Sequence, residues 1–269
     1  MYPVPMEIID FHTHAFPDHL AGRAIAALLD SVERAKACTD GTLAGLQASM
    51  RKNRISRSVL LPIATKPAQV PKIIETCKAW MLQDCVPFGS LHPDSPSMDS
   101  DIRLLKAYGV RGVKLHPEFQ NFHIDDPGVF PMYDALSQAR LIAVFHAGKD
   151  PGPFSGDHAL PAAFKAVHAN FPRLKIVAAH MGGWQVWDQV RRHTAGLPIF
   201  FDTSSVRDHL PREEFLRLAR KHGTERILFG SDSPWFEPGD DLRWLDSIGL
   251  KADELEQILH KNAEALLGL

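Results

Sequence analysis

Apolar stretches along this chain end repeatedly in a histidine or an aspartate. Continuous apolar runs of this length, separated by helical patterns, predict buried parallel strands. A polar residue at the C-terminal end of such a strand faces the mouth of a barrel or the edge of a sheet, where ligands bind. Five runs follow this pattern and end at His12, His116, His146, His180 and Asp232. The pattern therefore predicts a metal site assembled from distant parts of one chain.

The whole chain divides into eight such strands, each followed by helical material. The predicted strands cover residues 7–12, 58–61, 86–91, 112–115, 141–145, 176–179, 198–202 and 227–231. Alternating strands and helices form a parallel sheet with right-handed crossovers, and eight such units typically close into a barrel. No linker or low-complexity tract interrupts the 269 residues. We therefore predict one α/β domain over residues 1–269, a (β/α)8 TIM barrel with an extra C-terminal helix at residues 253–267.

Residues 20–52 contain two helical patterns between the first two strands, separated at residues 38–41. Thr42 is the expected N-cap of the second helix. This pair either covers the mouth of the barrel or packs against its outside, and the sequence leaves both arrangements open.

The amino-acid composition mainly excludes classes of binding partner. Hydrophobic residues make up 45% and charged residues 23% of the chain, and the formal net charge is −2. This balance shows no general bias toward nucleic acids or anionic membranes. No apolar run approaches the ~20 residues that cross a bilayer, and residues 1–7 show neither half of a secretory leader. We expect a cytoplasmic protein that acts on a small molecule, and the sequence does not separate a monomer from a homo-oligomer.

The side chains available for metal binding are imidazoles and carboxylates rather than thiols. The chain has 14 histidines and only three cysteines, with no CxxC spacing. Cys77 and Cys85 are expected to be small core residues. Nitrogen and oxygen ligands suit Zn²⁺, Mn²⁺ or Fe²⁺.

His12 and His14 are two residues apart at the end of the first strand. Side chains alternate along a strand, so both imidazoles are expected on one face. Such a pair alone arises by chance in a histidine-rich chain. Asp232, however, ends the eighth strand, which neighbours the first in a closed barrel. His146 and His180 end strands on the opposite wall, from which ligands can converge.

Several motifs resemble the amidohydrolase superfamily, and more narrowly its amidohydrolase-2 branch. They are Asp-Phe-His-Thr-His at residues 10–14, Phe-His-Ala-Gly at 145–148, Ala-His-Met-Gly-Gly at 179–183, Phe-Gly-Ser-Asp-Ser-Pro-Trp at 229–235 and the terminal segment 258–267. That branch contains metal-dependent hydrolases and enzymes similar to aminocarboxymuconate-semialdehyde decarboxylase. The likeness spans nearly the whole chain and supports fold and metal, but it leaves the substrate open.

The resemblance implies one divalent cation, most simply Zn²⁺, held by His12, His14, His146 and Asp232. It also implies that His180 acts as an acid, a base or a polarising group. Elementary chemistry agrees, because a catalytic zinc lowers the pKa of bound water and needs a carboxylate that accepts the proton. Asp232 is thus expected to be both ligand and general base.

Lys114 and His116 have more than one interpretation. Lys114-Leu115-His116-Pro117 resembles a segment of dihydroorotase-like relatives whose lysine is carbamylated and bridges two metals. In that case His146 and His180 would bind the second ion. Otherwise Lys114 binds a substrate carboxylate, and His116 is a ligand, a substrate contact or a hydrogen-bonded residue at the strand end. We favour the single-metal interpretation.

Further substrate contacts are predicted on weaker grounds. They are His92, which ends the third strand, Lys149 and Arg207 in loops at the mouth, and Trp235 after the eighth strand. The other histidines on helical segments are expected to face solvent: His168, His193, His222 and His260.

Two enzymatic functions follow from these assignments. In the first, metal-activated water hydrolyses a small amide, lactone or ester. In the second, the metal holds the carboxylate of a small aromatic or muconate-type acid, which then loses carbon dioxide. The shortness of the chain relative to decarboxylase-like members favours hydrolysis. A non-catalytic metal-binding barrel is the third hypothesis, and the complete set of His12, His14, His146, His180 and Asp232 argues against it.

Overall fold

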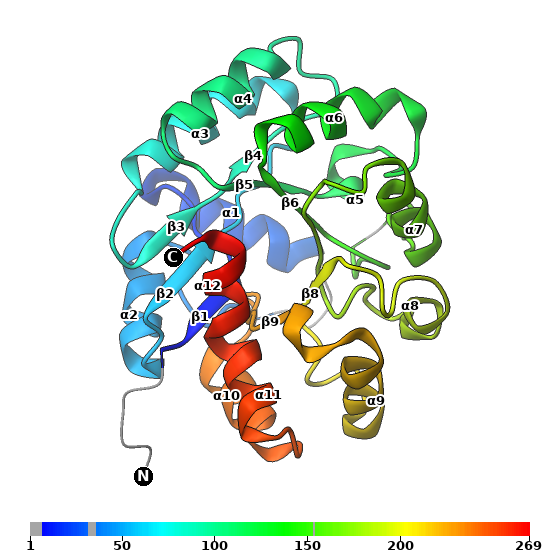
Figure 1. Ribbon diagram of the computed structural model, residues 1–269. Helices are drawn as coiled ribbons and strands as arrows, with labels where there is room; N and C mark the ends of the chain where they lie inside the picture. Colours follow the sequence, from blue (N-terminus) through cyan, green and yellow to red (C-terminus); the bar gives the residue numbers. More distant parts are fainter. Residues whose placement is uncertain (1–6, 32–35, 153) are drawn as a thin grey trace.

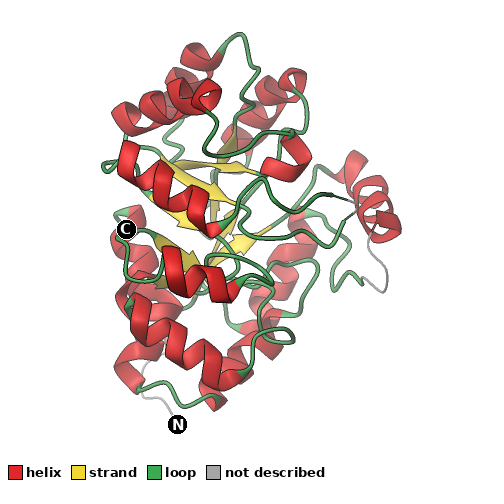
Figure 2. Ribbon diagram, turned by 90° about the vertical axis from the view of Figure 1, so that its right-hand side faces the viewer, coloured by secondary structure: helices red, strands yellow, loops and turns green. Residues whose placement is uncertain are grey.

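Parallel strands form the centre of the molecule and helices surround them (Figures 1 and 2). The computed structural model describes residues 7–31, 36–152 and 154–269. The strands are β1 (Ile9–Thr13), β2 (Arg57–Leu60), β3 (Cys85–Pro87), β4 (Gly89–Ser90), β5 (Gly112–Leu115), β6 (Ile142–Phe145), β7 (Ile176–Ala178), β8 (Phe200–Asp202) and β9 (Ile227–Leu228). The helices are α1 (Asp18–Ser31), α2 (Leu43–Asn53), α3 (Val70–Ala79), α4 (Met98–Ala107), α5 (Pro117–Gln120), α6 (Phe130–Ala139), α7 (Pro161–Asn170), α8 (Trp187–His193), α9 (Arg212–His222), α10 (Pro238–Ser247), α11 (Ala252–Glu256) and α12 (Asn262–Leu267).

The strands pair in chain order, first β1 to β3 and then β4 to β9, and every named pair is parallel. The predicted third strand is broken at Phe88, which separates β3 from β4. Backbone bonds join the two ends of the series, because the amide of Phe11 donates to the carbonyl of Phe229 at 2.7 Å. The amide of Asp232 likewise donates to the carbonyl of His12 at 2.8 Å. The predicted (β/α)8 barrel is confirmed.

Strand side chains alternate between two apolar layers. In β6, Ile142 and Val144 belong to the cluster inside the barrel, whereas Ala143 and Phe145 belong to the larger cluster between strands and helices. The inner cluster also includes Leu266 and Leu267 of α12. The expected C-terminal helix therefore packs against the interior of the barrel, and a π-helical turn at Gln257–Lys261 separates α11 from α12.

The two helices between β1 and β2 have different positions. Thr42 is the N-cap of α2, as predicted, and its side chain accepts a hydrogen bond from the amide of Gly45 at 2.9 Å. The α2 residues Leu46 and Met50 pack into a small apolar cluster with Leu60 of β2, on the outside of the barrel. Helix α1 instead lies behind the ring of strands in Figure 1, across the end of the barrel. The pair thus combines both arrangements that the sequence left open.

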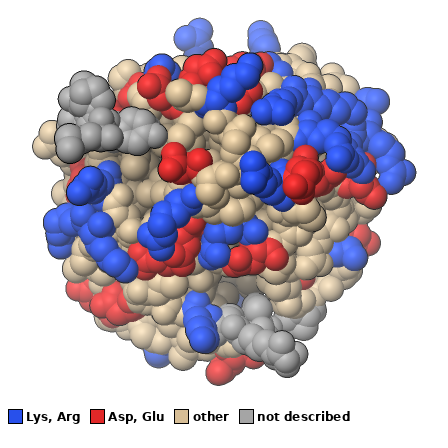
Figure 3. Space-filling view, turned by 90° about the horizontal axis from the view of Figure 1, so that it is seen from below, with Lys and Arg blue, Asp and Glu red and all other residues tan. Residues whose placement is uncertain are grey.

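Among the described residues, no helix is both long enough and apolar enough to cross a bilayer. Lysine and arginine side chains are interspersed with acidic ones on the face in Figure 3. Residues 1–6, on which the expectation of no leader rests, lie outside the described part, and the cytoplasmic location stays a prediction. Cys77 and Cys85 are buried, as expected.

His222 contradicts the expectation of a solvent-facing imidazole. Its side chain is 0% exposed and stacks on the ring of Phe201 at 3.7 Å between centroids. Its Nε2 donates to the carbonyl of Ile199 at 3.0 Å, and Nδ1 accepts from the amide of Gly196 at 3.3 Å. Both ring nitrogens are therefore satisfied in the neutral form, and burial, assisted by Arg226, lowers the pKa of His222 to about 3. The helical sequence pattern around His222 does not reveal that its imidazole is buried against Phe201.

This burial predicts a pH-dependent contribution to stability. The unfolded chain protonates His222 below its ordinary pKa of about 6.5, whereas the folded chain does not, so the free energy of unfolding falls as the pH falls from 6.5 toward 3. His222→Gln should be less stable at pH 7 but lose about 3 kcal/mol less than the wild type between pH 7 and pH 4. Urea unfolding at three pH values measures this. His19→Gln, at an exposed position, is the control. Equal losses in wild type and His222→Gln would refute the prediction.

Candidate metal and substrate site

The polar strand ends meet in one cavity of about 1060 Å³. His12 and His14 come from β1 and the residue after it, and Asp232 follows β9. The residues that follow β5, β6 and β7 also line the cavity, together with Lys114 of β5. They are His116, His146 and, two positions after β7, His180. Five strands thus deliver their side chains to one place, as the sequence pattern predicted.

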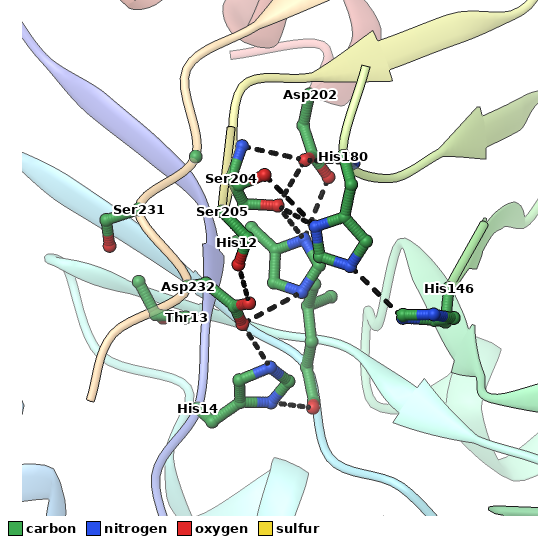
Figure 4. A network of polar contacts seen from close by, with 12 residues as sticks. His12, Thr13, His14, His146, His180, Asp202, Ser204, Ser205, Ser231 and Asp232 are labelled. Atoms are coloured by element: carbon green, nitrogen blue, oxygen red, sulfur yellow. Dashed lines mark hydrogen bonds and ion pairs between the residues drawn. The ribbon is translucent and has the colours of Figure 1, made fainter. Parts of the chain in front are cut away.

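His12, His14 and Asp232 form one group of possible metal ligands at this end of the barrel. The Oδ1 atom of Asp232 lies 3.1 Å from Nε2 of His14 and 3.5 Å from Nε2 of His12 (Figure 4). The other nitrogen of His14, Nδ1, donates to the carbonyl of Leu61 at 2.8 Å. Two imidazole nitrogens and a carboxylate oxygen at such separations are a donor set that suits a divalent transition metal.

Neighbouring imidazoles keep Asp232 ionised in this group. Burial raises the pKa of the carboxyl, but His12, His14 and His180 outweigh that effect and hold the pKa well below its usual range. Asp232 has φ 64°, in the left-handed region that is uncommon for a residue with a side chain. His180 also lies in this region, at φ 59°. Such outliers cluster where surrounding contacts fix a functional side chain.

Asp202 is a site residue that the sequence analysis did not select. Its Oδ2 accepts a hydrogen bond from Nδ1 of His12 at 2.8 Å, and its Oδ1 accepts from the amide of His180 at 3.0 Å. The carboxylate therefore leaves Nε2 of His12 as the nitrogen that faces Asp232. Burial raises the pKa of Asp202, but His12 and His180 outweigh it and the net shift is downward. Asp202 could have been selected from the sequence, because it is the last residue of β8 and thus a polar residue at a strand end like the other site residues.

His180 is grouped with His12 and Asp202 and also faces His146, which lies outside the His12, His14 and Asp232 group. His180 Nε2 lies 3.1 Å from Nδ1 of His146. His146 is grouped with His116 and Asp150, since Oδ2 of Asp150 lies 3.4 Å from Nε2 of His116 and 3.7 Å from Nε2 of His146. The two rings of His116 and His146 stack at 4.3 Å. The assignment of His146 as a ligand beside His12 stays a prediction.

Lys114 lies between these groups and is only 1% exposed. Its Nζ lies 3.2 Å from Nε2 of His12. Burial lowers the pKa of Lys114 to about 8, although Asp202, Asp232 and Asp150 favour its charged form. A buried ammonium that opens onto a cavity is a suitable partner for an anionic ligand.

The four residues predicted as further substrate contacts do not all reach the cavity. Trp235 lines the cavity. His92, Lys149 and Arg207 are not among its lining residues. The imidazole of His92 accepts from the amide of Asp94 at 3.2 Å, and the guanidinium of Arg207 pairs with Asp241 at 3.0 Å. Lys149 contributes its carbonyl, which accepts from Nε2 of His146 at 2.9 Å.

A TIM barrel with imidazoles and carboxylates at the C-terminal ends of its strands defines a class of enzyme scaffolds. Residues 9–269 match the family model described as Amidohydrolase, Amidohydro_2. The chain therefore belongs to this amidohydrolase family, as its motifs predicted.

Among curated proteins, the chain is similar to the decarboxylase orsB of Emericella nidulans, with 30% identity over 137 residues. That alignment covers 43% of this chain and 40% of the relative, so the chain spans about two fifths of the length of the curated protein that it matches.

Solved structures share the fold at low identity. An uncharacterized TIM-barrel protein from Bordetella bronchiseptica superposes with a TM-score of 0.77 and 20% identity, over 97% of this chain and 98% of the other. The 5-carboxyvanillate decarboxylase of Sphingomonas paucimobilis superposes with a TM-score of 0.73 and 15% identity, over 98% of this chain and 99% of the other. A dihydroxybenzoic acid decarboxylase from a Polaromonas species, with bound manganese and the inhibitor 2-nitroresorcinol, superposes with a TM-score of 0.75 and 14% identity. The superposition covers 98% of this chain and 97% of the other.

The hydrogen bond between Asp202 and His12 predicts a measurable effect on metal binding. A carboxylate behind a ligating imidazole fixes its tautomer and raises its basicity, so Asp202→Asn should weaken Mn²⁺ binding by about 10- to 100-fold. Calorimetric titration of metal-free protein measures the affinity. Asp94→Asn removes an exposed carboxylate and should bind Mn²⁺ like the wild type. Equal affinities for wild type and Asp202→Asn would exclude this role for Asp202.

Proposed function

We propose that this chain is a metal-dependent, non-oxidative decarboxylase of an aromatic acid. The observation that carries the proposal is the combination, in one cavity, of a metal-type donor set with the buried ammonium of Lys114. Aromatic side chains line the same cavity: Phe16, Trp80, Phe119, Trp184, Trp235 and Phe236. An aromatic ring that bears a carboxylate matches both the apolar walls and the cation.

We assign the cation to His12, His14 and Asp232, with His146 as the expected fourth ligand. The donor set accommodates Zn²⁺ or Mn²⁺, and the manganese in the Polaromonas decarboxylase makes Mn²⁺ a suitable first choice. When bound, the metal would supply Lewis-acid polarisation of the substrate oxygens. Asp202 would hold the imidazole of His12 in position, and Lys114 would pair with the carboxylate of the substrate.

The reaction requires one proton and one broken carbon–carbon bond. The bond between ring and carboxylate breaks, its electron pair stays on the ring carbon, and carbon dioxide leaves. A proton must then reach that carbon. His180 lines the cavity and donates from Nδ1 to the carbonyl of Ser204 at 3.1 Å, so a proton on its Nε2 would make it a cationic acid suited to this transfer.

The relatives support decarboxylation over the hydrolysis that the sequence favoured. The curated relative and the Sphingomonas and Polaromonas structures are decarboxylases. The length of the chain does not disfavour decarboxylation either, because the superposition with the Sphingomonas enzyme covers 98% of this chain and 99% of that one. Hydrolysis of an amide, lactone or ester becomes the competing outcome of the test.

The test is release of labelled carbon dioxide. Protein loaded with Mn²⁺ or Zn²⁺ is incubated with carboxyl-labelled 2,4- and 2,6-dihydroxybenzoate and 5-carboxyvanillate, and in parallel with aryl amides and lactones. We expect labelled carbon dioxide in equal amount to the acid consumed, and we expect Asp232→Asn to abolish its release. Hydrolysis of amides or lactones without release of carbon dioxide from any acid would overturn the proposal.

Lys114 should contribute through its charge. Loss of a charge-assisted hydrogen bond from a buried ammonium to a carboxylate costs about 1.5–3 kcal/mol, so Lys114→Met should lower kcat/KM for the acid by about 10- to 100-fold, mainly through KM. Lys165→Met alters an exposed lysine of α7 and should leave kcat/KM unchanged. Thermal unfolding of both variants checks that the barrel is intact. An unchanged KM in Lys114→Met would remove this role.

A further inference from the structure

The cavity extends well beyond the strand ends that carry the chemistry. Gln69, Lys72, Ile73, Thr76 and Trp80 line it, and they succeed one another along one face of α3 from its N-cap to its C-cap. At a rise of 1.5 Å per residue, these positions span about 16 Å. The cavity therefore follows the whole length of α3, which is far more than a single-ring acid occupies.

Helix α1 also lines this extension. Leu20, Ala24 and Leu28 line the cavity at a spacing of four residues, so they form one stripe on the helix. Within residues 18–30 of α1, only Ala21 is fully buried. The stripe therefore faces the cavity rather than the barrel core. We call the space lined by this stripe and by the α3 face the tail groove.

The chemistry of the tail groove is apolar with a cationic border. Besides the stripe, Ile73 and Trp80 supply apolar surface. Among the described residues, the charged side chains that line the cavity besides Lys114, Asp150 and Asp232 are Arg23, Lys36 and Lys72, and all three are basic. A volume of about 1060 Å³ slightly exceeds the roughly 300–1,000 Å³ typical of sites for drug-sized ligands. The border suits an anionic substrate, and the interior suits hydrocarbon.

We infer that the substrate is an aromatic acid that carries an extended apolar substituent, longer than a methyl group, and that this substituent lies in the tail groove. The inference rests on the proposed function for the identity of the ring and its carboxylate. The apolar stripe of α1 would then bury the substituent against α3 while the ring stays at the polar strand ends. Each additional methylene transferred from water to apolar surface strengthens binding by about fourfold.

The direct test compares resorcinols that differ only in chain length. Calorimetry with 5-methylresorcinol and 5-pentylresorcinol needs no carboxylate and no turnover, so it is independent of the proposed reaction. Four added methylenes should tighten binding to the wild type by on the order of 100-fold. In parallel, kcat/KM for 6-pentyl-2,4-dihydroxybenzoate should exceed that for the 6-methyl compound by a similar factor.

Two alanines of α1 provide a matched pair of variants. Ala24→Trp places a large side chain in the tail groove and should reduce the pentyl-to-methyl affinity ratio at least tenfold. Ala27→Trp makes the same change at an exposed position of the same helix that does not line the cavity, and it should keep the wild-type ratio. Comparing ratios within each variant removes general effects on folding or metal content.

The outcomes separate the two proposals. A wild-type affinity ratio near one, or an equal fall of the ratio in both tryptophan variants, would overturn the tail groove whatever the protein catalyses. A second set of results would support the tail groove but refute the proposed reaction. In that case the pentyl compound binds much more tightly than the methyl compound and only Ala24→Trp removes this preference, but no acid releases carbon dioxide.

Discussion

Backbone hydrogen bonds between β1 and the segment around β9 hold the two ends of the chain together, and the polar site depends on them. The carbonyl of His12 accepts from the amide of Asp232, so the same contact that closes the barrel places an imidazole beside a carboxylate. Asp10 reinforces this closure, because its carboxyl accepts from the amide and the hydroxyl of Ser231 at 3.0 and 2.6 Å. Burial raises the pKa of Asp10 to about 7 despite these bonds. A slip of β1 against β9 would separate the ligands as well as the strands.

The site holds ionised groups in a region where burial alone would neutralise them. Asp202 and Asp232 are held ionised by the imidazoles around them, and Lys114 adds a cation near His12. Such groups are costly to bury unless they pair with one another or with a ligand. The apolar walls contributed by α1 and α3 line the same cavity, and apolar surroundings strengthen each of these interactions. The helices thus serve the chemistry although they supply none of the metal-type donors.

Much of the fold could be predicted because strand signals are local. A buried parallel strand needs a continuous apolar run, and β5, β6 and β7 each present one that ends near a histidine. The N-cap of α2 at Thr42 follows from an equally local rule. The break at Phe88 and the π-helical turn in the last helix were not predicted, because packing against neighbouring strands and helices decides them.

The sequence by itself determined which residues stand at strand ends, and so which imidazoles and carboxylates could meet, because strand periodicity and chain order depend only on near neighbours along the chain. Tertiary structure alone decided which of them do meet. It set Asp202 behind His12, turned His146 toward His180 and His116, and enclosed His222 within apolar surroundings. These outcomes depend on strand register, on the left-handed backbone at His180 and Asp232, and on packing between distant segments. A shift of one residue in the register of a strand would change which side chains face each other in the site.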